Sequence, residues 1–356
     1  MGTTDTGLPT TILPLCYKIP LEPITHFLTG AVLARAGFNR RTALAAATMT
    51  LAAEAPDLDV LWGFKGPVYG FAHHRGFTHS FLGLILVSTV VTGFMYLVWL
   101  VRGRRTSIPG LPPRWGLLFL FAYIAGLSHL LLDFTNNYGV RPFWPFWEKW
   151  YSWDIVFIFE PALYIILIAG LLLPALFSRD EPLPRGRKFA VAALICVALL
   201  YAFRDHEHRH AVQALRQQQF ESGAPVRVSA YPYYWSLYQW YAVAETASSF
   251  ATTDIDSRTG QLNRSELKYF SKPPETPVTL AAKRSYLGRV YLSWAQYPLV
   301  TESESGEDSI VRFRDLRYDY PRLRGRITLS CSVELDKGLH IVRERFGRKE
   351  QVPPID

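Results

Sequence analysis

Cysteine and methionine are scarce in this chain, each contributing three of its 356 residues. Cys16, Cys196 and Cys331 are scattered, with no CxxC or other paired spacing. This excludes a disulfide framework and a zinc site built from cysteines. Basic residues are also absent from residues 1–17, so no charged segment precedes an apolar one as it would in a secretory signal. We therefore expect internal helices to direct the chain to a membrane.

Apolar runs long enough to cross a bilayer are absent after residue 204, where charged and aromatic residues mix. Before that point, four segments approach or exceed the roughly 20 residues that a spanning helix needs. The composition predicts an N-terminal tail over 1–20, a helical membrane domain over 21–204 and a C-terminal extramembrane domain over 205–356. The expected spans cover residues 80–101, 115–134, 154–177 and 188–204.

The net charge of +8 invites a nucleic-acid partner, but its distribution argues against one. Many basic residues occupy short loops between apolar segments, which is typical of cytoplasmic loops under the positive-inside rule. We therefore expect membrane lipids, and no nucleic acid, as partners. These basic residues are Arg40, Arg41, Arg102, Arg104, Arg105, Arg114, Arg179, Arg185, Arg187 and Lys188.

Two further helices, each too short to span fully, precede the first long apolar run. One begins at His26 and reaches Arg35, and the second runs from Thr42 to about Ala53. The expected fold is an α-helical membrane bundle of four clear helices plus these two short N-terminal ones, followed by a β-rich soluble domain.

Three of the nine histidines fall within residues 73–79, directly before a long apolar run. Imidazole is the commonest metal ligand in proteins. Gly76 allows a tight bend between His74 and His79, and Thr78 or Ser80 could cap the helix that follows. The pattern predicts a metal site at a bilayer surface.

Carboxylates and a further histidine occur near the ends of other helices. His129 and Asp133 are four residues apart, so on a helix they share one face. Pro56 disfavours the helical conformation at Ala55, so the carboxylates of Asp57 and Asp59 are expected to lie in a turn. With the basic loops cytoplasmic, the non-cytoplasmic ends carry His26, Asp57, Asp59, His73, His74, His79, His129, Asp133 and Asp154.

Mixed His and Asp ligation suits a divalent Zn, with Mn or Fe also possible. Because six or more candidate ligands exceed what one tetrahedral zinc needs, one or two ions are expected. Two-metal sites hydrolyse phosphoesters or amides. Arg75 could stabilise negative charge in a transition state, Asp59 could be a ligand or general base, and Asp154 could orient the ligands.

Other readings stay open for single residues. For His26 a packing role is the alternative to ligation, and His73 is expected near the site rather than on the ion. The His206–His210 run (His-Glu-His-Arg-His) is interpreted as a solvated segment after a helix end. The aromatic residues of 143–153 suit an interfacial belt.

Together, Thr25-His26, Pro56-Asp57-Leu58-Asp59, the His74–Ser80 segment and His129–Asp133 resemble the predicted membrane-bound, metal-dependent hydrolases of the bacterial inner (cytoplasmic) membrane. This family also includes LexA-binding hydrolase-like proteins, although no LexA-binding surface is indicated here. The resemblance covers roughly residues 20–170. The metal ligands that it implies are His26, Asp57, His74, His79, His129 and Asp133.

Residues 205–356 predict an antiparallel sheet with short turns. Strands are expected over 227–231, 289–294 and 326–333, where β-branched and aromatic residues are frequent. Turns are expected at 256–260 and 336–338. This domain is placed on the face of the membrane that carries the metal cluster.

The leading hypothesis is a membrane metal-dependent hydrolase whose site lies at the non-cytoplasmic face and takes a phosphoester or lipid-linked substrate. One alternative is a proton- or cation-coupled transporter, which predicts titratable groups throughout the membrane depth. Another is a non-catalytic assembly or regulatory protein with a structural metal, which an open coordination position would argue against.

Overall fold

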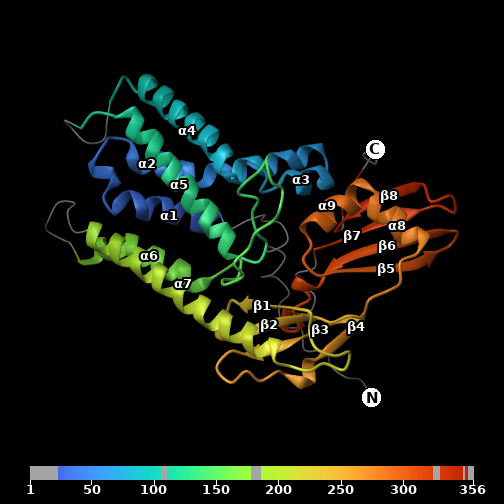
Figure 1. The fold of residues 1–356 in the computed structure, drawn as a ribbon. Coiled ribbons are helices and arrows are strands. Elements are labelled where there is room, and N and C mark those ends of the chain that lie inside the picture. The colour runs from blue at the N-terminus through green and yellow to red at the C-terminus, as the bar shows by residue number, and fades with distance from the viewer. Residues whose placement is uncertain (1–22, 106–110, 178–185, 324–328, 348, 352–356) are drawn as a thin grey trace, which may run out of the picture.

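The computed structural model describes residues 23–105, 111–177, 186–323, 329–347 and 349–351. Helices form one part of the molecule, and two antiparallel sheets form most of the other (Figure 1). This arrangement confirms a helical bundle followed by a β-rich region. The predicted tail over 1–20, with Cys16, and the basic residues Arg179 and Arg185 lie outside the described residues.

The two short N-terminal helices are present as α1 (Pro23–Arg35) and α2 (Ala45–Glu54). They pack closely because small residues face each other. A Cβ on Gly30 would lie 2.8 Å from the Met49 carbonyl oxygen, so α1 tolerates no side chain there. Alanines of α2, including Ala52 and Ala53, are fully buried against α5 (Trp115–Thr135). This tight contact fixes α2 relative to α5, which matters for the site.

Within the described residues, three helices are long and apolar enough to cross a membrane: α4 (Phe81–Val101), α5 and α7 (Gly186–Arg216). The helix expected over 154–177 begins only at Pro161 and ends at Phe177, giving a shorter α6. Residues 154–160 instead run as an irregular segment, in which Ile155 N donates to the Thr135 carbonyl at 3.0 Å. The predicted helix start at residue 154 is therefore wrong.

The predicted helix end near residue 204 is also wrong, because α7 continues for 31 residues without a break. Arg204, Glu207, Ala211 and Leu215 are buried along one face of its C-terminal part. That face covers strands of the first sheet. The drop in hydropathy marks a change in what the helix packs against, so the expected domain boundary at 204/205 falls within α7, as does the His206–His210 run.

The described residues of the basic turns lie together at the end of the bundle opposite the sheets (Figure 1). The backbone N–H of Arg114 donates to Thr42 Oγ1 at 2.7 Å, joining the first and second basic turns. Arg187 Nε donates to the carbonyl of Ala36 at 3.0 Å. Described residues of all three basic loops thus share one end, as the charge pattern predicts.

Two antiparallel sheets, rather than the single sheet expected, follow α7. The first has the order β1-β2-β3-β4 and the second β5-β6-β7-β8-β9. The strand expected over 227–231 is confirmed within β1, as are both predicted turns. The strands are β1 (Arg227–Tyr233), β2 (Ser236–Glu245), β3 (Ser249–Asp256), β4 (Lys268–Ser271), β5 (Pro298–Ser305), β6 (Asp308–Asp315), β7 (Ser330–Leu335), β8 (Ile341–Phe346) and β9 (Lys349–Gln351).

The strand expected over 289–294 is wrong, because this segment belongs to helix α9 (Tyr286–Trp294). Ser285 caps the helix, its Oγ accepting a hydrogen bond from the backbone N–H of Gly288 at 3.0 Å. Leu287, Tyr291 and Trp294 are buried at helical spacing. The third expected strand, 326–333, is confirmed only over 330–333, within β7; residue 329 precedes β7, and 326–328 lie outside the described residues.

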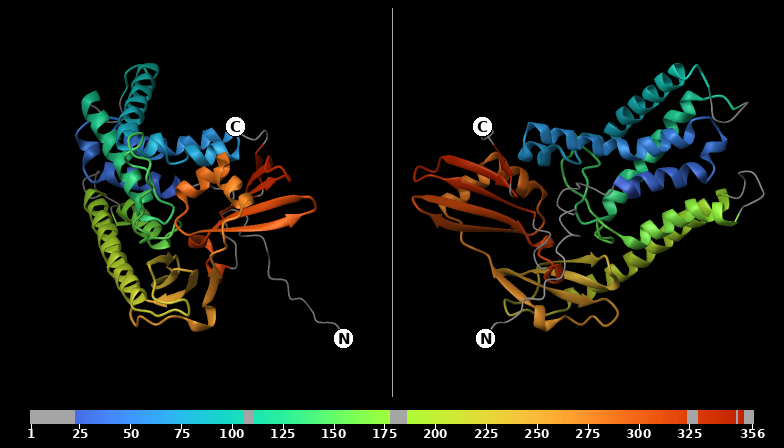
Figure 2. Two further views of the ribbon diagram at one scale, coloured as in Figure 1. Left: turned by 45° about the vertical axis from the view of Figure 1, so that its right-hand side comes forward. Right: turned by 180° about the vertical axis from the view of Figure 1, so that it is seen from behind.

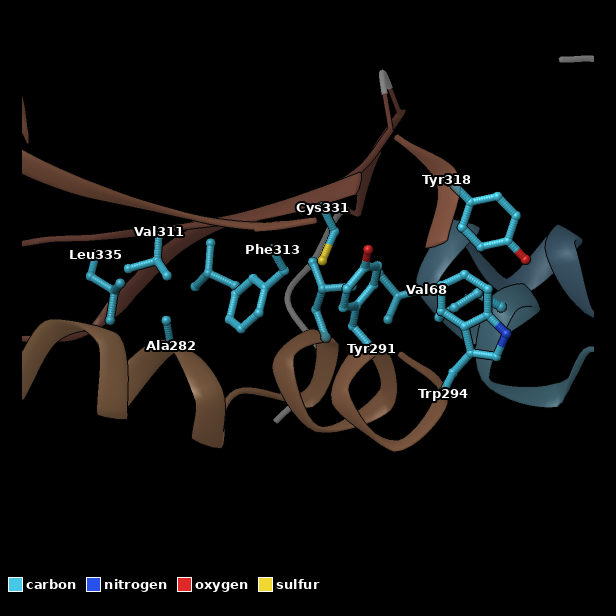
Figure 3. Packing of buried hydrophobic residues seen from close by; sticks show 12 residues of the cluster. Val68, Ala282, Tyr291, Trp294, Val311, Phe313, Tyr318, Cys331 and Leu335 are labelled. Carbon is cyan, nitrogen blue, oxygen red and sulfur yellow. The ribbon is translucent and has the colours of Figure 1, made fainter. Parts of the chain in front are cut away.

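The second sheet packs against the helical part through a short helix, α3 (Pro67–His73). Val68 and Phe71 of α3 are buried in one core with Ala282 of α8 (Pro277–Arg284), Tyr291 of α9 and Phe313 of β6 (Figure 3). Figure 2 shows α3 reaching from the bundle toward α9 and the second sheet. The C-terminal region is thus anchored directly beside the histidine cluster. The remaining 3-10 segments in this region are η4 (Arg264–Glu266), η5 (Leu316–Tyr318) and η6 (Pro321–Leu323).

Candidate metal centre

The paired carboxylates lie on a 3-10 segment, η2 (Ala55–Lys65), that continues directly from α2. Ala55 keeps helical angles, φ −60° and ψ −32°, so the prediction that Pro56 forces it out of this conformation is wrong. Proline is tolerated in the first turn because its missing N–H would have no partner there. The segment turns Asp59 inward, with 3% of its surface exposed.

The histidine cluster lies on a bend between α3 and α4. A Cβ on Gly76 would lie 2.8 Å from the carbonyl oxygen of His73, so the bend requires glycine. Arg75 has a φ of +50°, a conformation that side-chain-bearing residues rarely adopt. A 3-10 turn, η3 (Phe77–His79), follows, and Ser80 Oγ caps α4 by accepting from Gly83 N at 2.9 Å. This bend directs His79 into the bundle.

Four side chains converge behind this bend: Asp57, His79, His129 and Asp133 offer ligand atoms that all lie within 4.8 Å of one another. Nε2 of His79 is 3.3 Å from an oxygen of each aspartate. Nε2 of His129 is 3.4 Å from Asp57 Oδ1 and 3.3 Å from Asp133 Oδ2, and the two Nε2 atoms are 2.9 Å apart. Ligands of one tetrahedral ion with bonds of about 2.0–2.1 Å lie about 3.3 Å apart, so these spacings fit a single ion.

Unsatisfied carboxylate oxygens supply a further test of this fit. Asp57 Oδ2 and Asp133 Oδ2 are buried without a hydrogen-bond partner. Such atoms are costly to bury unless a cation or a donor compensates them. Asp133 Oδ2 and the other oxygen of Asp57, Oδ1, lie beside the two imidazole nitrogens, and mixed nitrogen and oxygen donors suit Zn, Mn or Fe. The residues present therefore fit a divalent transition-metal ion.

Both histidine ligands are oriented by groups behind them. Nδ1 of His129 lies 2.7 Å from the carbonyl oxygen of Ala53, which can only accept, so Nδ1 carries the proton. Nδ1 of His79 lies 3.2 Å from Asp59 Oδ2, which favours the same tautomer. Each arrangement leaves Nε2 free to bind an ion, as is usual for histidines that ligate metals. The last turn of α2 and the carboxylates of η2 thus set the ligand geometry.

Asp133 is held in place by Arg75. Nη2 of Arg75 donates to Asp133 Oδ1 at 2.7 Å, while Nη1 donates to the carbonyl of Gly139 at 3.0 Å and to Asn136 Oδ1 at 3.3 Å. Its backbone N–H donates to Asp59 Oδ2 at 2.7 Å. A buried guanidinium with these partners is well suited to positioning the ligands.

Asp57, Asp59 and His79, which lie outside the spanning helices, stabilise one another's charged forms. Burial alone would raise the pKa of Asp57, but the imidazoles of His129 and His79 hold it well below its usual range. Burial would likewise raise the pKa of Asp59, but the imidazoles of His74 and His79 hold it well below its usual range. Burial would lower the pKa of His79, yet hydrogen bonds to Asp133, Asp57 and Asp59 raise it well above its usual value. The carboxylates therefore favour the ionised form, and an ion bound at His79 Nε2 would replace the proton that they otherwise stabilise there.

Two of the predicted ligands lie beside the four-residue group rather than within it. The His26 ring stacks on His129 with centroids 3.8 Å apart, and its Nε2 is 3.5 Å from Asp133 Oδ1. His74 Nδ1 is 3.0 Å from Asp59 Oδ1, and its ring centroid is 6.1 Å from that of His79. Both residues contact a ligand or its orienting carboxylate.

Two other candidates lie away from the group. His73 stacks on Tyr69, with centroids 3.9 Å apart, and its Nδ1 contacts the Tyr69 carbonyl. Asp154 instead lies near Ser152 and the charges of Arg317 and Asp315, which belong to the C-terminal region. Neither has a described contact with the four ligand atoms.

Arg141 is a site-forming residue that sequence reasoning missed. Its guanidinium donates to the carbonyls of Ala72 at 2.7 Å and His74 at 3.2 Å, and it lies over the Trp150 ring. It therefore braces the backbone of the histidine bend. An arginine within an aromatic loop was the only signal in the sequence, because the backbone carbonyls that it contacts are not encoded by any residue type.

Fold and site together define a membrane protein with a buried histidine–aspartate group able to hold a metal ion at one end of its bundle. The family model for the YdjM inner membrane protein matches residues 21–211, more than half of the chain, and the chain belongs to this family. This finding confirms the resemblance to a bacterial inner-membrane family of metal-dependent hydrolase-like proteins.

One curated relative is the uncharacterized protein YfhP of Bacillus subtilis (strain 168). It is 25% identical over 118 residues, which cover 33% of each chain. The match therefore spans about a third of that relative's length. No solved structure matches the chain.

Proposed function

We propose that this protein is a membrane metal-dependent hydrolase whose single divalent ion is held by Asp57, His79, His129 and Asp133. The proposal rests on the convergence of two imidazoles and two carboxylates and on the difference in how deeply these four side chains are buried. Three of the four ligand side chains are at most 3% exposed, whereas Asp57 is 13% exposed. Four protein ligands fill a tetrahedral shell, so catalysis requires a further coordination position, and the partial exposure of Asp57 marks the side on which we propose that the ion accepts one.

The residues around the ion divide into holding and positioning groups. When bound, a divalent ion would supply Lewis acidity toward a phosphoryl or carbonyl oxygen. Asp59 holds the Nδ1 proton of His79, and Arg75 holds Asp133, so both are proposed to position ligands rather than act as base or anion binder. His74, paired with Asp59 and 15% exposed, is proposed to carry protons.

The substrate is proposed to be a phosphoester, including a lipid-linked one, at the non-cytoplasmic face. Support comes from the position of the site at the end of the bundle away from the basic turns. The clustering of titratable groups at one end favours this proposal over a transporter, which needs such groups along the membrane depth.

The first test is metal content by elemental mass spectrometry on protein purified in detergent without chelators. Wild type is compared with His79→Ala, Asp133→Ala and the control His73→Ala, whose ring stacks on Tyr69 outside the group. We expect one equivalent of Zn, Mn or Fe in the wild type and in the control. We expect none in His79→Ala or Asp133→Ala. Metal-free wild type after metal supplementation would contradict the proposal.

The second test is hydrolysis. The loaded protein is assayed against p-nitrophenyl phosphate, bis-p-nitrophenyl phosphate and phosphatidic acid in mixed micelles. Turnover that disappears in Asp133→Ala supports a hydrolase, whereas a stoichiometric metal with no turnover of any phosphoester favours a structural metal.

A further inference from the structure

The segment η2 has an exposed surface that is unusual for a protein in water. In a 3-10 helix, residues three apart lie above one another, so Leu58, Leu61 and Phe64 form one stripe. These side chains are 62%, 54% and 88% exposed, while the carboxylate of Asp59 is turned inward. We call Leu58, Leu61 and Phe64 the η2 ridge. Its apolar side chains point away from the protein and its acid points in.

Residues beside the ridge have the chemistry of a membrane interface. Trp62 is 41% exposed, and its ring lies near those of Tyr69 and His73. The Lys65 ammonium lies 5.0 Å from the centroids of both Trp62 and Tyr69. Tryptophan, tyrosine and a lysine that extends toward headgroups typically mark the boundary between hydrocarbon and water.

The ridge is also close to a helix that spans the membrane. η2 packs against α4, whose first residues Phe81 and Leu82 are exposed. On that helix's N-terminal end, Phe143 contacts Phe81 with ring centroids 5.6 Å apart. The following Phe146 is 84% exposed. Apolar side chains from η2 and from the 143–147 loop therefore extend the lipid-facing surface of α4.

We propose that the η2 ridge inserts into the bilayer that α4 spans, as a second, non-spanning membrane contact. Continuity with α4 identifies the partner as lipid, because an apolar stripe left in water beside a spanning helix would be costly. Asp57 and Asp59 flank Leu58, so insertion places the metal group at headgroup depth. The ridge does not require hydrolysis; if the proposed function holds, it selects substrates that reside in the membrane.

The test uses site-directed spin labels on the full chain in lipid nanodiscs. Cys16 and the exposed Cys196 are replaced by serine, and the buried Cys331 is kept. Labels are placed singly at Leu61→Cys and Phe64→Cys. Phe94→Cys, exposed in the middle of α4, is the lipid reference, and Val226→Cys, exposed before β1, is the water reference. Unchanged metal content checks that each variant is folded.

Power saturation with oxygen and with a water-soluble nickel chelate decides the outcome. The proposal predicts an oxygen-to-nickel accessibility ratio at 61 and 64 several-fold above that at 226 and approaching that at 94. A ratio like that at 226 would overturn it. Low accessibility to both reagents would also overturn it, since the ridge would then be covered by protein, either residues 1–22 or a second copy.

Discussion

Arg75 and Asp133 are joined by a buried ion pair with Nη2 and Oδ1 2.7 Å apart, across 58 residues of sequence. The pair connects the histidine bend to the last turns of α5. It therefore couples the two segments that supply His79 and Asp133, so the geometry of the candidate ligands depends on a residue outside the four-residue group.

Replacing Arg75 by lysine tests this dependence. Lysine keeps the charge but cannot contact Asp133, Asn136 and Gly139 together, because it lacks the planar fork of donors. We expect about a 10–100-fold loss of metal affinity, the usual effect of losing a partner behind a ligand. Competition with a fluorescent zinc chelator measures it. Arg322→Lys, in a half-exposed pair with Asp254, is the control and should bind metal as wild type does.

Asp59→Asn should also weaken metal binding without abolishing it. Asparagine accepts a weaker hydrogen bond from His79 Nδ1, so the imidazole loses both orientation and basicity. About a 10–100-fold fall in affinity is expected, against complete loss in Asp133→Ala. Asp256→Asn, which breaks an exposed pair with Arg258, serves as the control. Complete loss in Asp59→Asn would show that Asp59 is itself a ligand.

Phe71 links the C-terminal core to the metal centre. Phe71→Ala and Phe313→Ala each remove a buried aromatic ring from one core, at an expected cost of about 3–5 kcal/mol. Only Phe71 belongs to α3, two residues before the histidine bend. Thermal unfolding should show similar losses in the two variants, while metal content should fall only in Phe71→Ala. Equal metal content would mean that the bend is positioned without α3.

Asp154 predicts a pH dependence of stability. Burial raises its pKa to about 6 against the opposing hydrogen bond of Ser152 and charge of Arg317, and the charge of Asp315 adds a smaller upward effect. The surrounding Tyr231, Tyr297 and Tyr320 add no positive charge. Because the folded state holds this proton to higher pH than the unfolded chain, the stabilisation is complete below about pH 4 and is lost as pH rises to about 6.

Asp154→Asn removes this titration. Denaturant unfolding of wild type and variant between pH 4 and 7 should show that the wild type loses stability relative to the variant across that window. Other carboxylates titrate alike in both proteins and cancel in the difference. A constant difference would contradict the raised pKa.

The four residues of the candidate metal group stood out in the sequence because ionisable residues at the ends of apolar helices have few structural uses. The sequence did not distinguish ligands from their supports. His74 and His79 belong to one motif, yet only His79 enters the four-atom group, since the bend at Gly76 sends them different ways. The Ala53 carbonyl that orients His129 is backbone and carries no sequence signal.

The errors in the fold share a physical cause. Segment 289–294 is rich in β-formers, but Ser285 caps a helix there and packing of Tyr291 and Trp294 overrides propensity. At residues 154–160, apolar character reflects burial of an irregular segment: Val156 pairs with Asn136 and Phe157 packs in the first sheet's core. The hydropathy of a segment indicates whether it is buried, but it does not determine whether its backbone is a helix, a strand or irregular.

Helix α7 fixes the distance between the membrane and the first sheet. Its 31 residues make it about 46 Å long, well beyond the roughly 30 Å hydrocarbon thickness. Its far end carries the first sheet, which rests on Ala211 and Leu215. The distance of that sheet from the bilayer is therefore set by one continuous helix. A membrane of different thickness would change that distance, because the length of the helix does not change.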